Sequence, residues 1–127
     1  MGKITGLGGV FIKAEDPKAL AAWYQQHLGI NFNGNVYIDF PFTDEAGKVT
    51  AGSNVLSFFK KDADYYLPSE KEVMLNLRVT GLKELLKQLA EAGVTIVGEL
   101  LEEDYGKFGW IMDPEGHKVE LWEPPVK

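Results

Sequence analysis

The sequence predicts an α+β fold made of two similar halves that share one sheet. The order strand, helix, glycine and hydrophobic residue occurs twice, over residues 6–30 and 72–94, and Leu20 and Leu85 mark an offset of 65 residues. Each copy carries hydrophobic residues at the spacing of a half-buried helix. The other segments alternate as strands do. Each half is therefore expected to hold one strand, one helix and up to three further strands, which gives a sheet of eight strands.

The first helix is predicted to lie between Asp16 and Gly29. Asp16 is a favourable N-cap, and Pro17 fits the first helical position. Gly29 can adopt the left-handed conformation that ends a helix. One stripe of this helix is expected to be buried on the sheet: Pro17, Leu20, Ala21, Tyr24 and Leu28.

The segments after the first helix are predicted to be strands, except for one second helix. Residues 36–40 alternate, and residues 49–59 are expected to form one strand or two strands separated by a glycine break. A turn of sequence DPEG separates two alternating segments, residues 108–112 and 118–122, and indicates a closing hairpin. The second helix is expected to end at Gly93 and to bury four leucines: Leu82, Leu85, Leu86 and Leu89. Two helices on one face would leave the other face free to curve around a ligand.

Composition excludes several classes of protein. The chain has 127 residues, a net charge of −6, two histidines and no cysteine, which suits one domain and excludes disulfides, thiolate metal sites and a cysteine nucleophile. The acidic balance argues against nucleic-acid binding and permits a cationic ligand. No segment approaches the roughly 20 apolar residues of a membrane span, so a cytoplasmic protein without a membrane partner is expected. Both histidines, His27 and His117, are expected at the surface.

Two segments resemble a known superfamily. GLGGVFIKAEDPKALAAWYQQHLGI, residues 6–30, resembles the first module of the vicinal oxygen chelate superfamily, which includes glyoxalase I, the bleomycin resistance proteins and the extradiol dioxygenases. DPEGHKVELWEP, residues 113–124, resembles its closing hairpin. The resemblance implies a single domain over residues 1–127, in which two tandem βαβββ modules, at about 5–62 and 70–123, form a curved, cup-like mixed sheet. It also implies a homodimer with sites in the cup.

The resemblance extends to only one of the four metal ligands of the metal-dependent members. Glu120 matches the ligand of the final strand, but the two histidine positions fall at Gly9 and Met74. Glycine cannot ligate, and a thioether is a poor ligand for the divalent metals of these enzymes. The remaining carboxylate should lie in residues 53–59, which contain none. We therefore predict no cofactor and do not expect a divalent metal.

Strand alternation predicts which side chains face the cup. Val119 and Leu121 would face the helices, so Glu120 faces the cup, where it is the candidate catalytic residue. Aromatic, thioether and polar side chains on this face, as in other small-molecule pockets, are the candidate ligand-binding residues, together with one loop tyrosine: Phe11, Phe58, Met74, Asn76, Arg78, Tyr105, Phe108 and Trp110.

One strand and two loops leave alternatives open. In the strand segment 49–59, alternation allows either of two sets to face the cup. We prefer residues 54, 56 and 58 over residues 55, 57 and 59. The loops 60–71, with two adjacent tyrosines, and 100–109, with the acidic run 102–104, are placed to cover the cup. If the acidic run borders the cup, it favours a cationic ligand and can position a general base.

The predicted function is small-molecule binding of the glyoxalase/bleomycin-resistance type, without the usual metal centre. Its ligand is unknown and expected to be cationic or aromatic. The alternative is a glyoxalase-type lyase or isomerase, similar to lactoylglutathione lyase, with Glu120 as base in a non-standard site. A third hypothesis is an interaction module. The sequence leaves open whether the protein is an enzyme.

Overall fold

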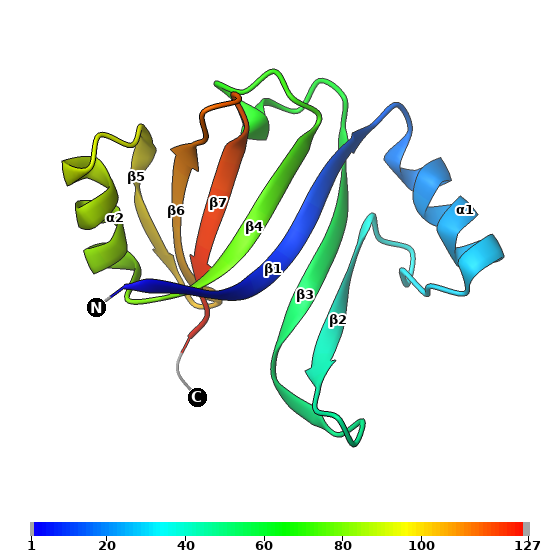
Figure 1. Cartoon of the computed structure of the whole chain (residues 1–127). Coiled ribbons are helices and arrows are strands. Elements are labelled where there is room, and N and C mark those ends of the chain that lie inside the picture. Colours follow the sequence, from blue (N-terminus) through cyan, green and yellow to red (C-terminus); the bar gives the residue numbers. More distant parts are fainter. Residues whose placement is uncertain (1, 126–127) are drawn as a thin grey trace.

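The structure is a computed structural model that describes residues 2–125. The seven strands form one open sheet in the order β2-β3-β1-β4-β7-β6-β5, with the two helices toward opposite ends (Figure 1). The predicted α+β class is confirmed. The elements follow in the order β1 (Lys3–Ala14), α1 (Pro17–Leu28), β2 (Tyr37–Thr43), β3 (Val49–Lys60), a short 3-10 helix η1 (Asp64–Tyr66), β4 (Val73–Thr80), α2 (Leu82–Glu91), β5 (Ile96–Glu103), β6 (Gly106–Met112) and β7 (Lys118–Glu123).

The two halves of the chain meet at the centre of the sheet. β1 and β4, the first strand of each half, pair in antiparallel orientation. Each of them pairs in parallel with the last strand of its own half, β1 with β3 and β4 with β7. The sheet is therefore mixed, and it is strongly curved (Figure 1).

The expectation of eight strands is wrong, because the described residues form seven. Residues 49–60 are one strand, since Gly52 (φ 99°) bends the chain while pairs on both of its sides, Val49 with Thr43 and Ser53 with Pro41, still join β2. The first half also has no strand directly after its helix. Asn33 and Gly34 have φ values of 53° and 77°, which turn the chain where the second half continues into β5.

Both helices pack on the same face of the sheet. At the start of α1, Asp16 accepts a hydrogen bond from the Ala19 amide at 3.0 Å, and at its end Gly29 has φ 71°, as predicted. Leu28 is 59% exposed and does not belong to the buried stripe. Below α1 lie three buried residues, Ala21, Phe32 and Phe58. Below α2 lies a second cluster, Val79, Leu82, Val119 and Leu121, with the other three predicted leucines packed against it.

Neither helix is long, with 12 residues in α1 and 10 in α2. Within residues 2–125, no helix combines the length and the apolar character needed to cross a membrane.

Candidate functional site

Glu120 lies on the concave face of the sheet, as alternation along β7 predicts. Its neighbours Val119 and Leu121 are buried under α2. Glu120 points to the opposite face and is 2% exposed. A carboxyl group this deeply buried needs hydrogen-bond donors around it, because burial without partners is costly.

Three donors surround the Glu120 carboxyl group. The Tyr65 hydroxyl and the Trp110 Nε1, the latter at 3.0 Å, both donate to Oε1. The Asn76 Nδ2 donates to Oε2. Asn76 and Trp110 are the direct neighbours of Glu120 on β4 and β6. The structure thus brings together three predicted site residues, Asn76, Trp110 and Glu120, and adds Tyr65.

Burial governs the titration of this cluster. It raises the pKa of Glu120, and the hydrogen bonds from Tyr65, Asn76 and Trp110 only partly oppose this effect. The pKa of Tyr65 is raised, first by burial and then by the Glu120 charge, so the hydroxyl stays protonated and donates a hydrogen bond to Glu120. Burial also lowers the pKa of Lys118, whose Nζ donates to the Tyr65 carbonyl at 2.5 Å and lies 5.1 Å from the Tyr65 ring centre.

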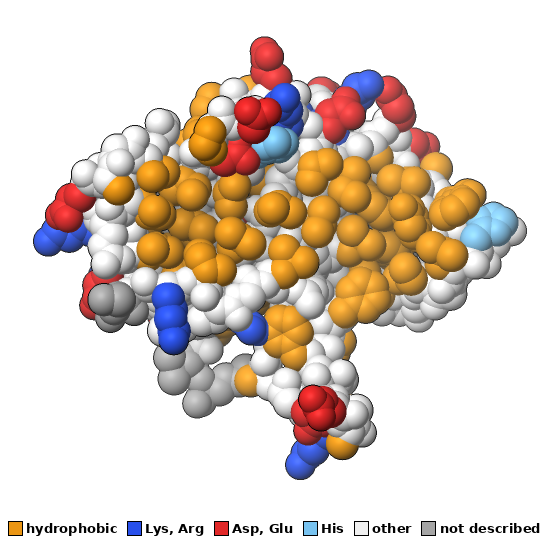
Figure 2. Space-filling view, in the orientation of Figure 1, with side chains coloured by type: hydrophobic (Ala, Val, Ile, Leu, Met, Phe, Trp, Pro, Cys, Tyr) orange, Lys and Arg blue, Asp and Glu red, His pale blue; other side chains and the backbone are white. Residues whose placement is uncertain are grey.

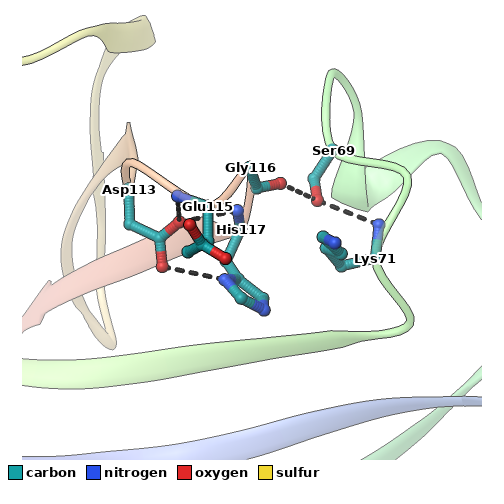
Figure 3. Close-up of polar contacts among 6 residues, drawn as sticks. All are labelled: Ser69, Lys71, Asp113, Glu115, Gly116 and His117. Atoms are coloured by element: carbon teal, nitrogen blue, oxygen red, sulfur yellow. Dashed lines mark hydrogen bonds and ion pairs between the residues drawn. The ribbon is translucent and has the colours of Figure 1, made fainter.

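Residues 61–72, here called the strap, close this end of the cup. The ring of Tyr65 stacks on Phe59 with centroids 5.6 Å apart and meets Trp110 edge-on at 6.2 Å. Farther along the strap, Ser69 Oγ donates to the Gly116 carbonyl at 2.5 Å and accepts from the Lys71 amide (Figure 3). The strap is thereby anchored to the turn between β6 and β7, and the Glu120 end of the cup is filled with protein.

The same turn accounts for His117. Its ring Nδ1 lies 2.9 Å from Asp113 Oδ2, and the His117 amide donates to Asp113 Oδ1 (Figure 3). These backbone and side-chain hydrogen bonds lower the pKa of Asp113. His27 is exposed near Trp23 on α1.

Several other predicted site residues also lie on the concave face, with one exception. Phe11 and Met74 are buried there with Tyr66, at the strap end of the cup. Phe58 is wrongly predicted to face the cup, because it lies under α1 and is 2% exposed. The other set on β3 faces the cup, and Phe59 packs against the Phe11 cluster.

An irregularity in β1 brings a second glycine, Gly8, beside the Glu120 cluster. Pairing between β1 and β4 is irregular between Leu7 and Gly9. A Cβ atom on Gly8 would collide with Asn76 Oδ1, whereas one on Gly9 would collide with the Val55 carbonyl. Gly8 is the extra residue at this irregularity and lies against the Asn76 side chain, while Gly9 pairs with Asn76 along the strand, and counting along the chain does not reveal such an irregularity.

The residues around Glu120 do not fit the divalent metal of the metal-dependent members. Within the described chain, no three His, Cys, Asp or Glu residues are close enough to share a metal ion. The Tyr65 hydroxyl and the Trp110 indole present hydrogens to Glu120, not lone pairs. Asn76 Oδ1 is buried without a partner, but one carboxylate and one amide oxygen fall short of a ligand set for such a metal.

The other end of the cup is open. A cavity of about 940 Å³, here called the Arg78 cavity, lies there. Arg78, Trp122 and Tyr105 line it, and Tyr105 is 63% exposed. The predicted residue Phe108 stacks on Trp122 with centroids 6.4 Å apart. The rest of the lining is mostly small or polar: Thr5, Asp39, Pro41, Val49, Thr50, Ala51, Gly52, Ser53, Val79, Thr80, Glu123, Pro124 and Pro125.

The acidic run 102–104 is not part of this lining. Glu102 instead pairs with Lys83 of α2, with Nζ and Oε1 3.4 Å apart. Sequence reasoning missed Tyr65 as the partner of Glu120, and the two adjacent tyrosines in the joining loop were the available signal.

The architecture and the concave glutamate define a class of protein. Two halves that place a helix on one face of a mixed sheet, with Glu120 of the last strand on the other face, are typical of the glyoxalase/bleomycin resistance/dioxygenase superfamily. The chain belongs to the glyoxalase-like domain family, which matches residues 9–122. No curated protein matches the sequence.

Solved structures with a similar fold include two epimerases. Methylmalonyl-CoA epimerase from Mycobacterium tuberculosis is 23% identical with a TM-score of 0.60, over 97% of this chain and 90% of that one. The Streptomyces coelicolor enzyme, in complex with 2-nitronate-propionyl-CoA, is 14% identical with a TM-score of 0.67, over 98% and 100%. A superfamily member from Vibrio splendidus 12B01 is 14% identical with a TM-score of 0.57, over 95% and 99%. At these identities, the likeness establishes the fold alone.

Proposed function

We propose that the protein binds a small molecule in the Arg78 cavity and does so without the divalent metal of its metal-dependent relatives. The observation that carries the proposal is the cavity itself. Its volume of about 940 Å³ lies within the range of roughly 300–1,000 Å³ typical of ligand sites. Its lining combines an aromatic wall with a few polar groups, as such sites do.

The buried Glu120 cluster has a structural part in this proposal. Both oxygens of the Glu120 carboxyl group accept hydrogen bonds within the protein, from Tyr65, Asn76 and Trp110, and the strap covers this cluster. Glu120 then holds Tyr65, Asn76 and Trp110 in place and closes one end of the cup, which leaves the Arg78 end for the ligand. Metal-free binding is supported by the donor set, because the groups around Glu120 present hydrogens to it.

An enzyme of lyase or isomerase type is the second candidate. One observation favours it: burial raises the pKa of Glu120 toward the range of a general base. To reach a substrate, however, the carboxylate would have to lose its bond to Tyr65, and the strap would have to open.

Thermal stabilisation tests the binding proposal. A panel of small aromatic compounds with anionic, neutral and cationic groups is added to the protein, and a compound that binds the folded state raises Tm. We expect at least one compound to do so, and Trp122→Ala to abolish the effect. Trp23→Ala, which removes a half-exposed indole of α1 that does not line the Arg78 cavity, should leave it intact. Absence of stabilisation across the panel would contradict the proposal.

Turnover tests the second candidate. The methylglyoxal–glutathione adduct is incubated with the protein, with and without added divalent metal. We expect no turnover above the uncatalysed rate. Turnover that is lost in Glu120→Gln would favour the enzyme over the binding protein.

A homodimer and a cytoplasmic location belong to the same proposal. Support for the dimer comes from the face that carries the helices. Ile4 and Leu7 on β1 and Leu75 on β4 are each more than 40% exposed there. In Figure 2, hydrophobic side chains form a broad patch from the side of α2 to the side of α1. Exposed patches of this kind often mark a protein interface, and a second copy is the occupant proposed here.

A further inference from the structure

We propose that the Arg78 cavity binds a small carboxylic acid with an aromatic or similarly flat apolar body. The inference rests on the proposed function and adds to it the chemical class of the ligand. Three features of the cavity carry it: an arginine without an acidic partner, open space beside the guanidinium group, and an aromatic wall next to it.

Arg78 lies on the concave face of β4 and forms no salt bridge within residues 2–125. Its Nε donates to Thr5 Oγ1 at 3.2 Å, and its guanidinium carbon lies 4.2 Å from the centre of the Phe42 ring. These contacts orient the guanidinium plane but leave both Nη groups without an acceptor in the described chain. A guanidinium group with two free Nη atoms can bind a carboxylate through two parallel hydrogen bonds.

The acidic residues of the cavity do not form ion pairs with Arg78. Both carboxylate oxygens of Glu123 are already used, because they accept from the amides of Gly81 and Leu82 at 3.1 and 3.0 Å. Asp39 is exposed on β2 and forms no ion pair with Arg78. The Arg78 guanidinium group therefore has no ion-pair partner in the described chain. An anionic group of the ligand would supply the missing partner of this guanidinium group, in contrast to the cationic ligand that the net charge of the chain favours.

Two glycines keep the guanidinium group accessible. A Cβ atom on Gly6 would lie 3.2 Å from Nη2, and one on Gly52 would lie 3.2 Å from Nη1 and 2.8 Å from the Phe42 ring. A side chain at either position would crowd the hydrogens that have no acceptor. The flanking strands thus leave space where a carboxylate would bind.

The aromatic wall stands directly beside the charge. Trp122 is the neighbour of Arg78 in the parallel pairing of β4 and β7. Its Nε1 donates to the Tyr105 carbonyl at 3.0 Å, and its ring lies nearly parallel to that of Phe108, at 9°. The indole is therefore held in one orientation. A flat apolar group attached to the carboxylate would pack against it while the carboxylate meets Arg78.

Three matched probes test the inference: anionic 2-naphthoate, neutral 2-naphthamide and cationic 2-naphthylmethylammonium. Each is titrated into the wild type and Arg78→Gln by isothermal calorimetry. We expect 2-naphthoate to bind the wild type most tightly and Arg78→Gln to weaken it by about 10- to 100-fold. The affinity for 2-naphthamide should not change. Arg78→Lys, which keeps the charge without the planar fork, should restore only part of the loss.

Lys87→Gln is the matched control, because it removes one positive charge from the exposed surface of α2. It should bind 2-naphthoate as the wild type does, and circular dichroism should show that all variants are folded. The inference is overturned if 2-naphthoate does not bind or if its affinity is no higher than that of 2-naphthamide. It is also overturned if Arg78→Gln leaves the affinity for 2-naphthoate unchanged. If another probe binds and Trp122→Ala abolishes that binding, only the ligand class is wrong. If none of the three binds and the wider panel fails too, the proposed function also fails.

Discussion

At the scale of single residues, the Glu120 carboxyl group is the centre of a buried polar cluster on the concave face. It is almost completely buried, yet three neutral donors reach its two oxygens. Burial raises its pKa more strongly than these hydrogen bonds and Lys118 lower it. The folded protein therefore binds the Glu120 proton more tightly than the unfolded chain does.

This preference predicts a pH dependence of stability. A raised pKa stabilises the fold below the unfolded value of about 4.3, and the contribution is lost as pH rises through the folded pKa. Glu120→Gln keeps the shape and removes the titration. We expect the free energy of unfolding of the wild type, relative to Glu120→Gln, to fall from about pH 4 toward neutrality. Denaturant titrations across this range measure it. A constant difference would contradict the raised pKa.

The Tyr65 hydroxyl is the donor that comes from outside the sheet. Tyr65→Phe removes one hydrogen bond from a buried carboxyl group and should lower the free energy of unfolding by about 1–3 kcal/mol. Tyr37→Phe is the control. Tyr37 is 49% exposed, so Tyr37→Phe should change the free energy of unfolding by no more than about 0.5 kcal/mol. Equal effects of the two substitutions in denaturant titrations would show that the Tyr65 hydrogen bond adds nothing.

At the scale of elements, the irregular pairing in β1 decides which glycine approaches the site. Gly8 lies against the side chain of Asn76, and no other residue would leave room for it. The strap is a second segment whose position depends on contacts with a distant part of the chain. Its conformation depends on contacts with the turn between β6 and β7, such as the hydrogen bond from Ser69 to Gly116.

A matched pair of glycine substitutions tests the role of β1. Gly8→Ala should displace Asn76 from Glu120 and lower the free energy of unfolding by about 1–3 kcal/mol. Gly6→Ala should cost less, because its Cβ would meet only the flexible end of Arg78 at 3.2 Å. Thermal denaturation of both variants measures the difference. If Gly6→Ala proves the more harmful, the placement of Gly8 beside the cluster is wrong.

At the scale of the whole molecule, the two faces of the sheet have different proposed roles. The concave face holds the Glu120 cluster and the Arg78 cavity. The opposite face carries both helices and leaves apolar side chains of β1 and β4 exposed between them, among them Leu7 and Leu75. The proposed ligand site and the proposed dimer contact therefore do not compete for the same surface.

This separation predicts the effect of charge on assembly. We expect the wild type to sediment at twice the mass of the chain. Leu7→Glu and Leu75→Glu should each shift it toward the monomer, because a charge would be buried in an apolar contact. Leu67→Glu, on the strap and 58% exposed, should not. A monomeric wild type, or a dimer that tolerates both substitutions, would contradict the proposed contact.

The sequence by itself determined the features that depend on neighbours along the chain. Asp16 and Gly29 bound the first helix, because capping is a local interaction. Glu120 faces away from the helices, because side chains alternate along a strand between Val119 and Leu121. The α+β class follows from such local patterns repeated twice, and the resemblance of residues 6–30 and 113–124 indicates the family.

Only the tertiary structure decided the features that depend on contacts between distant segments. Alternation could not choose the inward face of β3, because Phe58 and Phe59 are equally apolar. The irregularity beside Gly8 arises in the pairing of two strands, and the bond from Tyr65 to Glu120 joins residues 55 positions apart. Whether Arg78 has an acidic partner is likewise a matter of distance in space. Pairing and packing set these distances, and local sequence does not encode them.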